Sequence, residues 1–329
     1  MIDLSPLAKR IKAATQITVV THRRPDGDAV GSALGLAFGI ESAYPSKRVT
    51  LLCADPIPRR LAFLAHGREM ETVFLPFPRP ELVIAVDVAS GSLLGEMQGQ
   101  IEDLVDVKLD HHPGGEDFAP LCLVDPTASA AGEMVFDLLS LLDAPQDEGK
   151  RLWAMTALYA AIASDCGSFR YSNVTPRTHE IAAALIRAGV DGSTVCHALF
   201  ESLEAGEVRA TRCAYEKLSF HLDGRIALIV VTLEDRKKWQ LDEEMLGLIS
   251  AIPRTIGGVE LGLVLRRMPE HPNTYKISAR SGETVDARAL CAEFGGGGHL
   301  RAAGGEIRAD SPEEAEAILL EAAIRRMTT

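Results

Sequence analysis

The sequence predicts an α/β protein in which an N-terminal domain with a parallel sheet is joined by a helical linker to a smaller mixed α/β domain. Three observations predict this architecture. The chain has 329 residues, which fits about two domains of ~150 residues. In the first half, short apolar runs alternate with longer helical patterns. After Asp191, neighbouring apolar runs are separated by a short turn, which indicates antiparallel pairing. The predicted boundaries are 1–192, 193–222 for the linker, and 223–329.

The elements of the first domain follow from apolar runs and helical periodicity. The run ITVV and three later runs have the length of buried strands. The expected strands lie at 17–20, 48–53, 81–88 and 105–110, and the expected helices at 30–43, 130–142 and 151–163. Because strands alternate with helices, the sheet is expected to be mostly parallel and covered on both faces.

The second domain has a different pattern. Residues 193–221 are expected to form one or two connecting helices, and strands are expected at 224–233, 259–268 and 273–281. The sequence PEHPN between the last two strands is a turn signal. A final amphipathic helix is expected at 311–327, since it starts with a serine cap, a proline at the first helical position and early acidic residues.

The composition argues against several classes of function. The formal net charge is -12, whereas proteins that bind long nucleic acids are usually basic, so no long duplex is expected as a partner. Aromatic residues make up 5%, which argues against broad stacking platforms for single strands. The six cysteines are scattered and indicate reduced thiols. With neither a signal peptide nor an apolar run of ~18 residues, the protein is expected in the cytoplasm and not in a membrane.

Acidic and histidine side chains follow the ends of several predicted strands. They are His22, Asp26 and Asp28 after the first strand, Asp87 at the end of the third, Asp110, His111 and His112 at the end of the fourth, and Asp165 after a helical run. Ligands of open parallel sheets bind beyond the carboxyl ends of the strands, so these groups are expected to converge. One such motif alone is more often a turn, a cap or a surface feature, but four together favour a metal centre.

The residue types indicate which metals would bind. Oxygen and imidazole donors without thiolates suit Mg²⁺ or Mn²⁺, and the imidazoles favour Mn²⁺. Clustered carboxylates repel one another and stay partly protonated. Two divalent cations would remove that cost and clamp a phosphoryl group. Gly27 permits a tight bend between Asp26 and Asp28, and the positive end of the following helix would face anions.

A glycine-rich run, GGGGH at 295–299, stands near the end of the second domain. We interpret it as an anion-binding loop whose backbone N–H groups approach an oxyanion; the alternative is a flexible linker. Arginines of the same domain suit phosphate recognition. Arg280 lies beside Ser278 in the strand pattern SARS, whereas other arginines are by default solvated surface residues.

Five motifs together resemble those of a known superfamily. HRRPDGDAVGS, AVDVAS, LDHHPG, ASDCGSFRYS and GGGGHLRAAGG occur in this order and resemble the DHH phosphoesterase superfamily with its DHH-associated C-terminal domain. The resemblance spans almost the whole chain. It is strongest to the group of bifunctional oligoribonucleases and phosphatases of 3'-phosphoadenosine 5'-phosphate (pAp), the nanoRNases. One departure is Cys166, which follows Asp165 where many members have threonine; because the aspartate is kept, little effect is expected.

The resemblance implies a role for each site residue. One metal would be held by His22, Asp26 and Asp87, and the other by Asp28, Asp87, His111 and Asp165. Asp87 would bridge the metals, Asp110 would orient His111, and His112 would face the substrate phosphate. The far end of the substrate would be bound by Arg280, Ser278, Gly296, Gly297, Gly298 and His299, with Arg254 as a weaker candidate.

By the same resemblance, the protein is expected to be a hydrolase that uses two Mn²⁺ ions, or Mg²⁺ or Co²⁺, to cut pAp and short RNA or DNA oligonucleotides. Alternatives within the superfamily are a cyclic or linear dinucleotide phosphodiesterase, a single-strand exonuclease of the RecJ type and a manganese pyrophosphatase. A non-catalytic nucleotide-binding protein is an alternative from another class, and it would have lost metal ligands. Homodimerisation is compatible with the sequence, but no motif indicates it.

Overall fold

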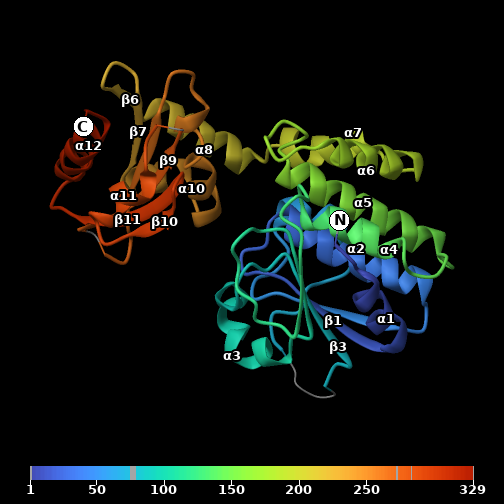
Figure 1. Ribbon diagram of the computed structural model, residues 1–329. Coiled ribbons are helices and arrows are strands. Elements are labelled where there is room, and N and C mark those ends of the chain that lie inside the picture. Colours follow the sequence, from blue (N-terminus) through green and yellow to red (C-terminus); the bar gives the residue numbers. More distant parts are fainter. Residues whose placement is uncertain (1, 75–78, 272, 283, 329) are drawn as a thin grey trace. The chain divides into compact units, whose positions relative to one another are not determined.

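The computed structural model describes residues 2–74, 79–271, 273–282 and 284–328. The chain forms two compact units, residues 1–202 and 203–329, and the division falls inside the stretch predicted as the linker. Each unit has its own sheet with helices packed on it (Figure 1), which confirms the predicted α/β class. Among the helices of the described residues, none is long and apolar enough to cross a membrane.

In the described part of the first unit, five parallel strands form a sheet with the order β2-β1-β3-β4-β5. The strands are β1 Gln16–Val20, β2 Arg48–Leu52, β3 Leu82–Val86, β4 Val107–Asp110 and β5 Leu121–Val124. The four predicted strands are confirmed, but β5 was not predicted. Only one of its four residues is buried, so burial marks it less clearly than the other strands.

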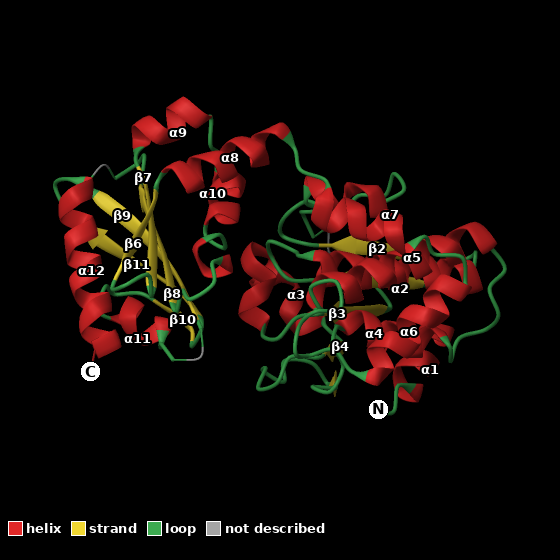
Figure 2. Ribbon diagram, turned by 90° about the horizontal axis from the view of Figure 1, so that it is seen from above, coloured by secondary structure: helices red, strands yellow, loops and turns green. Residues whose placement is uncertain are grey.

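Helices cover both faces of this sheet (Figure 2). The α-helices are α1 Ser5–Ala13, α2 Gly27–Ala43, α3 Gln98–Ile101, α4 Ala131–Leu139, α5 Glu148–Asp165, α6 Pro176–Arg187 and α7 Gly192–Cys196. Further helical turns are η1 Arg59–Leu64, η2 Gly91–Met97, η3 Glu102–Leu104 and η4 His197–Glu201. One face of the sheet packs on α1, α2, α4 and α5, and the other on η2 and α3. Helix α6 was not predicted; a capping box of Thr175 and Thr178 starts it.

Helices α2 and α5 lie close together because glycines of α2 face α5. A Cβ atom on Gly31 would lie 2.5 Å from the carbonyl oxygen of Ala157 and 2.8 Å from the Cβ of Ala161. There is no room for a side chain at this position, so the two helix backbones nearly touch. The contact brings Asp28, at the start of α2, close to Asp165, at the end of α5.

The described strands of the second unit form a six-stranded sheet with the order β10-β11-β9-β8-β7-β6. They are β6 Leu218–His221, β7 Ile226–Val231, β8 Leu261–Arg267, β9 Thr274–Ser281, β10 Gly297–His299 and β11 Ala302–Arg308. Only β7 and β8 pair in parallel. The helices are α8 Ala205–Glu216, α9 Leu233–Trp239, α10 Glu243–Ile249, η5 Pro253–Thr255, α11 Ala287–Ala292 and α12 Pro312–Thr328. Helices α11 and α12 pack on one face, and α8, α9 and α10 on part of the other.

Two predictions for the second unit need correction. The helical prediction over 193–221 fails at its end, where Leu218–His221 forms strand β6 and pairs with β7. The glycine-rich run, interpreted as an anion-binding loop, is a loop only in part, because Gly297–His299 forms strand β10 of a hairpin with β11; its anion binding stays a prediction. Gly298 has φ +138°, and a Cβ there would lie 2.6 Å from the carbonyl oxygen of Ala302. The glycines therefore allow close strand pairing, which the sequence interpretation did not consider.

Candidate metal centre

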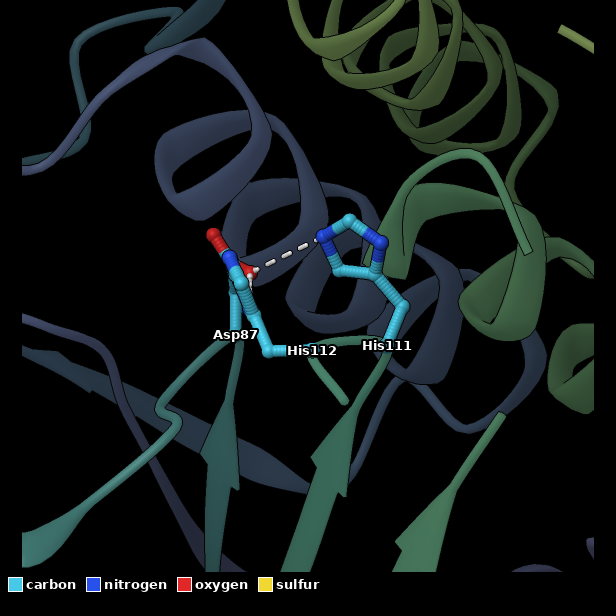
Figure 3. Close-up of side chains that lie close together, drawn as sticks. All are labelled: Asp87, His111 and His112. Carbon is cyan, nitrogen blue, oxygen red and sulfur yellow. Dashed lines mark ion pairs between the residues drawn. The ribbon is translucent and has the colours of Figure 1, made fainter. Parts of the chain in front are cut away.

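The structure brings together the charged residues that the sequence predicted to converge. His22 follows β1, Asp87 follows β3 and His111 follows β4. Figure 3 shows Asp87 and His111 facing each other from neighbouring strands. In three groups, the potential metal-ligating atoms lie within 4.8 Å of one another: His22, Asp26 and Asp87; Asp28, His111 and Asp165; and Asp87, His111 and His112.

The start of α2 positions two of the aspartates. Asp26 caps the helix, since its Oδ1 accepts hydrogen bonds at 3.0 Å from the N–H groups of Asp28 and Ala29. Asp28 is buried and accepts hydrogen bonds from Ser32 Oγ at 2.8 Å and from the first two N–H groups of α4 at 2.7 and 3.0 Å. These bonds fix Asp28 with its Oδ2 3.6 Å from Nε2 of His111.

Asp87 lies between the two histidines with one carboxylate oxygen toward each. Its Oδ2 is 3.6 Å from Nε2 of His22, and its Oδ1 is 3.7 Å from Nε2 of His111. The side chain is buried, and Oδ1 accepts no hydrogen bond from the described residues. The backbone of Asp87 has φ +59°, a strained conformation that non-glycine residues keep mainly at functional sites. The geometry suits a carboxylate that bridges two cations.

Hydrogen bonds orient both histidine rings with Nε2 toward the carboxylates. Nδ1 of His22 lies 2.9 Å from the carbonyl oxygen of Arg23, and Nδ1 of His111 lies 3.3 Å from that of Ala128. A carbonyl oxygen can only accept, so Nδ1 carries a proton in each pair, and Nε2 presents a lone pair to a metal once that nitrogen is deprotonated. Nε2 of His111 is buried and has no hydrogen-bond partner among the described residues. Each imidazole is therefore arranged as a metal ligand would be.

The carboxylate of Asp110 contacts the ring of a different histidine from the one that the resemblance implied. Its Oδ1 lies 2.9 Å from Nδ1 of His112, so it orients the His112 ring, whereas the His111 ring is held by Ala128. Asp110 also accepts from the backbone N–H groups of His111 and His112 at 2.9 and 3.3 Å. The side chain of His112 is 48% exposed. The ring is thus accessible to a ligand, while the hydrogen bond to Asp110 fixes its orientation.

Asp165 is held by a residue that the sequence analysis did not select. Nδ2 of Asn173 donates to the carbonyl oxygen of Ser129 at 3.0 Å and lies 3.4 Å from Oδ2 of Asp165. Two further residues were missed: Ser32, which bonds to Asp28, and Lys108, which is buried inside β4. A lysine within an otherwise apolar strand run was the signal available for Lys108.

The ionisable groups of the cluster are strongly perturbed when no metal is bound. Burial raises the pKa of Asp28 well above its ordinary value, and the charges of Asp87 and Asp165 raise it further. Burial also raises the pKa of Asp165 to about 6, against an opposing effect of His111. Burial acts to lower the pKa of His22, but hydrogen bonds to Asp26 and Asp87 outweigh it and raise the pKa to about 10. Without metal, these groups therefore retain protons, which reduce the repulsion between the carboxylates; bound cations would reduce the same repulsion.

These observations fit two divalent cations. The donors are carboxylates and imidazoles, two buried ligand atoms lack hydrogen-bond partners among the described residues, and Asp87 is common to two of the donor groups. Neutral imidazole and carboxylate oxygen are ligands suited to divalent metals such as Mn²⁺ and Mg²⁺. The side chains are therefore grouped as the ligands of metal ions would be.

We expect stabilisation of the protein by Mn²⁺ to weaken as the pH falls through about 6. Burial raises the pKa of Asp165 to about 6, and below this pH protons compete with the ion. In metal-free protein the same raised pKa stabilises the fold at low pH, and this contribution is lost as the pH rises from about 4 to about 6. Thermal unfolding of chelated and Mn²⁺-loaded protein, from about pH 4 to pH 8, measures both effects. An equal rise in Tm with Mn²⁺ at both ends would contradict the prediction.

The residues predicted to bind the far end of the substrate lie in the second unit. Ser278 and Arg280 project from the same half-exposed face of β9, where their partners across the strands are Gly304 and Ala302 of β11. Gly297 pairs in turn with Gly304. Gly296 precedes the hairpin, Gly298 lies within β10, and exposed Arg254 lies in η5. The backbone of His299 ends β10, but its side chain lies outside the described part of the structure. This group remains a predicted binding surface.

Comparison with known proteins finds similarity along both units. Residues 16–163 match the model described as DHH family, N-terminal domain, and residues 204–329 match the DHHA1 domain. The bifunctional oligoribonuclease and PAP phosphatase NrnA of Thermus thermophilus is 30% identical over 95% of this chain and 90% of its own length. The cyclic-di-AMP phosphodiesterase GdpP of Geobacillus thermodenitrificans is 27% identical over 96% of this chain but 48% of its own length.

A solved structure has the same fold. The exopolyphosphatase-related protein from Bacteroides fragilis superposes with a TM-score of 0.84 at 23% identity, covering 98% of this chain and 96% of that chain. At this identity the likeness establishes the fold, and the chemistry has to be argued from the cluster of aspartates and histidines.

Proposed function

The chain belongs to the DHH family, and from this premise we propose that it is a two-metal phosphoesterase that hydrolyses pAp and short oligonucleotides, with Mn²⁺ as the metal. The observation that carries the proposal is Asp87, which presents one carboxylate oxygen to each of two histidines. The similarity to the Thermus oligoribonuclease and PAP phosphatase over nearly the whole chain supports this choice of substrate class.

The residues that would hold the two cations are assigned from the donor groups. They are His22, Asp26 and Asp87 for one ion, and Asp28, Asp87, His111 and Asp165 for the other. When bound, two such ions supply charge stabilisation for a phosphoryl group and activate water. Asp110 fixes the ring of His112, whose exposed side binds the phosphate of the substrate. Because Nδ1 of His112 bonds to a carboxylate, Nε2 faces the substrate, and when the ring carries a second proton there, Nε2 can donate a hydrogen bond to a developing negative charge.

We assign the rest of the substrate to the second unit. Arg280 offers a guanidinium group that suits a second phosphate, and Ser278 adds a hydroxyl on the same face of β9. Across the strands from Ser278, Gly304 and Gly297 carry no side chain, so a planar base or a phosphate can approach the backbone there. A substrate with two recognised ends, such as pAp or a dinucleotide, matches these features.

A second candidate within the family is a cyclic-dinucleotide phosphodiesterase. The similarity to the Geobacillus cyclic-di-AMP phosphodiesterase extends over 96% of this chain, so the same cluster and the same glycine-rich hairpin would serve that reaction. This chain spans about half the length of that relative. The two candidates share the metal chemistry and differ in the substrate.

A substrate panel tests the proposal. Purified protein is incubated with Mn²⁺ and pAp, a diribonucleotide, a long single-stranded RNA or cyclic di-AMP, and the products are separated by ion-exchange chromatography. We expect cleavage of pAp and the dinucleotide and little cleavage of the long RNA. Preference for cyclic di-AMP would favour the second candidate. If no substrate is cut although Mn²⁺ binds, both candidates fail.

A further inference from the structure

Lys108 is a positively charged residue inside the sheet of the first unit. It lies in β4, between β3 and β5, and its side chain is fully buried. A buried ammonium group is costly unless it is paired and hydrogen-bonded. Its Nζ donates to the carbonyl oxygens of Ala89 at 2.9 Å and Glu116 at 3.0 Å, and it lies 5.6 Å from the centre of the Phe118 ring. Gly115 leaves room for it, since a Cβ there would lie 2.7 Å from Nζ.

The remaining neighbour of this ammonium group is Asp110. Nζ of Lys108 lies 3.3 Å from Oδ2 of Asp110, and both side chains are buried. This Oδ2 accepts no hydrogen bond from the described residues, so the lysine charge is what compensates it. The other oxygen, Oδ1, accepts from Nδ1 of His112 and from the N–H groups of His111 and His112. One oxygen of the carboxylate thus contacts Lys108, and the other accepts hydrogen bonds from His111 and His112.

We propose that Lys108 is a positioning residue for His112, acting through Asp110. The ammonium group holds Oδ2 and so turns Oδ1 toward the ring of His112. Since a carboxylate oxygen accepts, Nδ1 of His112 carries the proton, and its Nε2 is left for the substrate. The inference rests on the proposed function, in which His112 contacts the phosphate. The inference adds Lys108, a buried charged residue that acts through Asp110 and is not itself proposed to contact a metal ligand or the substrate.

A double-mutant cycle separates this role from a purely structural one, because Lys108 also holds the segments that contain Ala89 and Glu116. Lys108→Met removes the charge and keeps the side-chain length. We expect kcat for pAp to fall ~10–100-fold, with little change in KM. In the Asp110→Asn background the same change should cost little, because the carboxylate it acts through is gone. Equal losses of kcat in both backgrounds would overturn the proposal.

A spectroscopic readout keeps the test independent of the substrate. Side-chain ¹⁵N shifts of His112 in Mg²⁺-loaded protein report its tautomer even if the protein cuts a different phosphoester. We expect one tautomer with Nδ1 protonated in the wild type and a mixture in Lys108→Met. If that variant does not fold, Lys108→Gln retains a donor for a carbonyl oxygen but has no charge, and it should show the same mixture. A wild-type tautomer in either folded variant would overturn the proposal.

Discussion

Asp87→Ala is expected to lower Mn²⁺-dependent turnover by at least about 10³-fold, more than the ~10–100-fold typical of residues that only support a ligand. Asp87 is buried and lies within 3.6 Å of His22 and 3.7 Å of His111. It is the residue common to the donor groups proposed for the two ions. Without its carboxylate, each metal position loses a ligand and each histidine loses an anionic partner. Both ions should therefore bind more weakly.

The measurement combines kcat/KM with the number of bound Mn²⁺ ions. Asp143→Ala is the matched control, because this aspartate belongs to the same unit but is 60% exposed and pairs with Lys12 on the surface. It should retain both turnover and metal. Asp87→Asn keeps the shape of the side chain without its charge and should be impaired nearly as much as the alanine variant. Near-normal turnover by folded Asp87→Ala would rule out the two-metal proposal.

The site residues that the sequence predicted best are those whose positions depend only on the strand pattern. His22, Asp87 and His111 follow three parallel strands, which end at the same edge of the sheet, so their convergence could be inferred without a structure. Asp165 is different, because it ends a helix. Its position depends on how closely α5 packs on α2, and apolar periodicity does not carry that information. Asp165 could be selected only through its motif.

Contacts between segments that are distant in the chain could not be predicted from the sequence. The β10–β11 hairpin consists largely of glycine and alanine, which have little intrinsic preference for strands; pairing with β9 determines its conformation. The sequence alone could not show what Lys108 contacts, because a lysine in an apolar run can also reach solvent. Only the folded chain brings the carbonyl oxygens of Ala89 and Glu116 to its ammonium group. Likewise, only the folded chain shows that Asp110 orients the ring of His112 and not the ring of His111.

Gly31→Ala is expected to destabilise the first unit by about 1–3 kcal/mol, the usual cost of overpacking a tight contact. Alanine is the better helix former by roughly 1 kcal/mol, so any loss reflects the contact between the helices. The new Cβ would lie 2.5 Å from the carbonyl oxygen of Ala157 and 2.8 Å from the Cβ of Ala161. Both atoms belong to the backbone of α5 or are attached directly to it, so α2 and α5 must separate. Asp28 and Asp165, which these helices carry, would then lie farther apart.

Thermal unfolding and Mn²⁺ titration measure the two consequences of Gly31→Ala. Tm should fall by roughly 2–4 °C for each kcal/mol lost, and Mn²⁺ should bind more weakly because the distance between Asp28 and Asp165 has changed. Gly99→Ala is the matched control: this glycine lies in α3 of the same unit, and a Cβ there has no atom within 4 Å. It should leave Tm unchanged or raise it slightly. If Gly31→Ala has the same Tm and Mn²⁺ affinity as Gly99→Ala, the close packing of α2 on α5 does not set the spacing of the metal ligands.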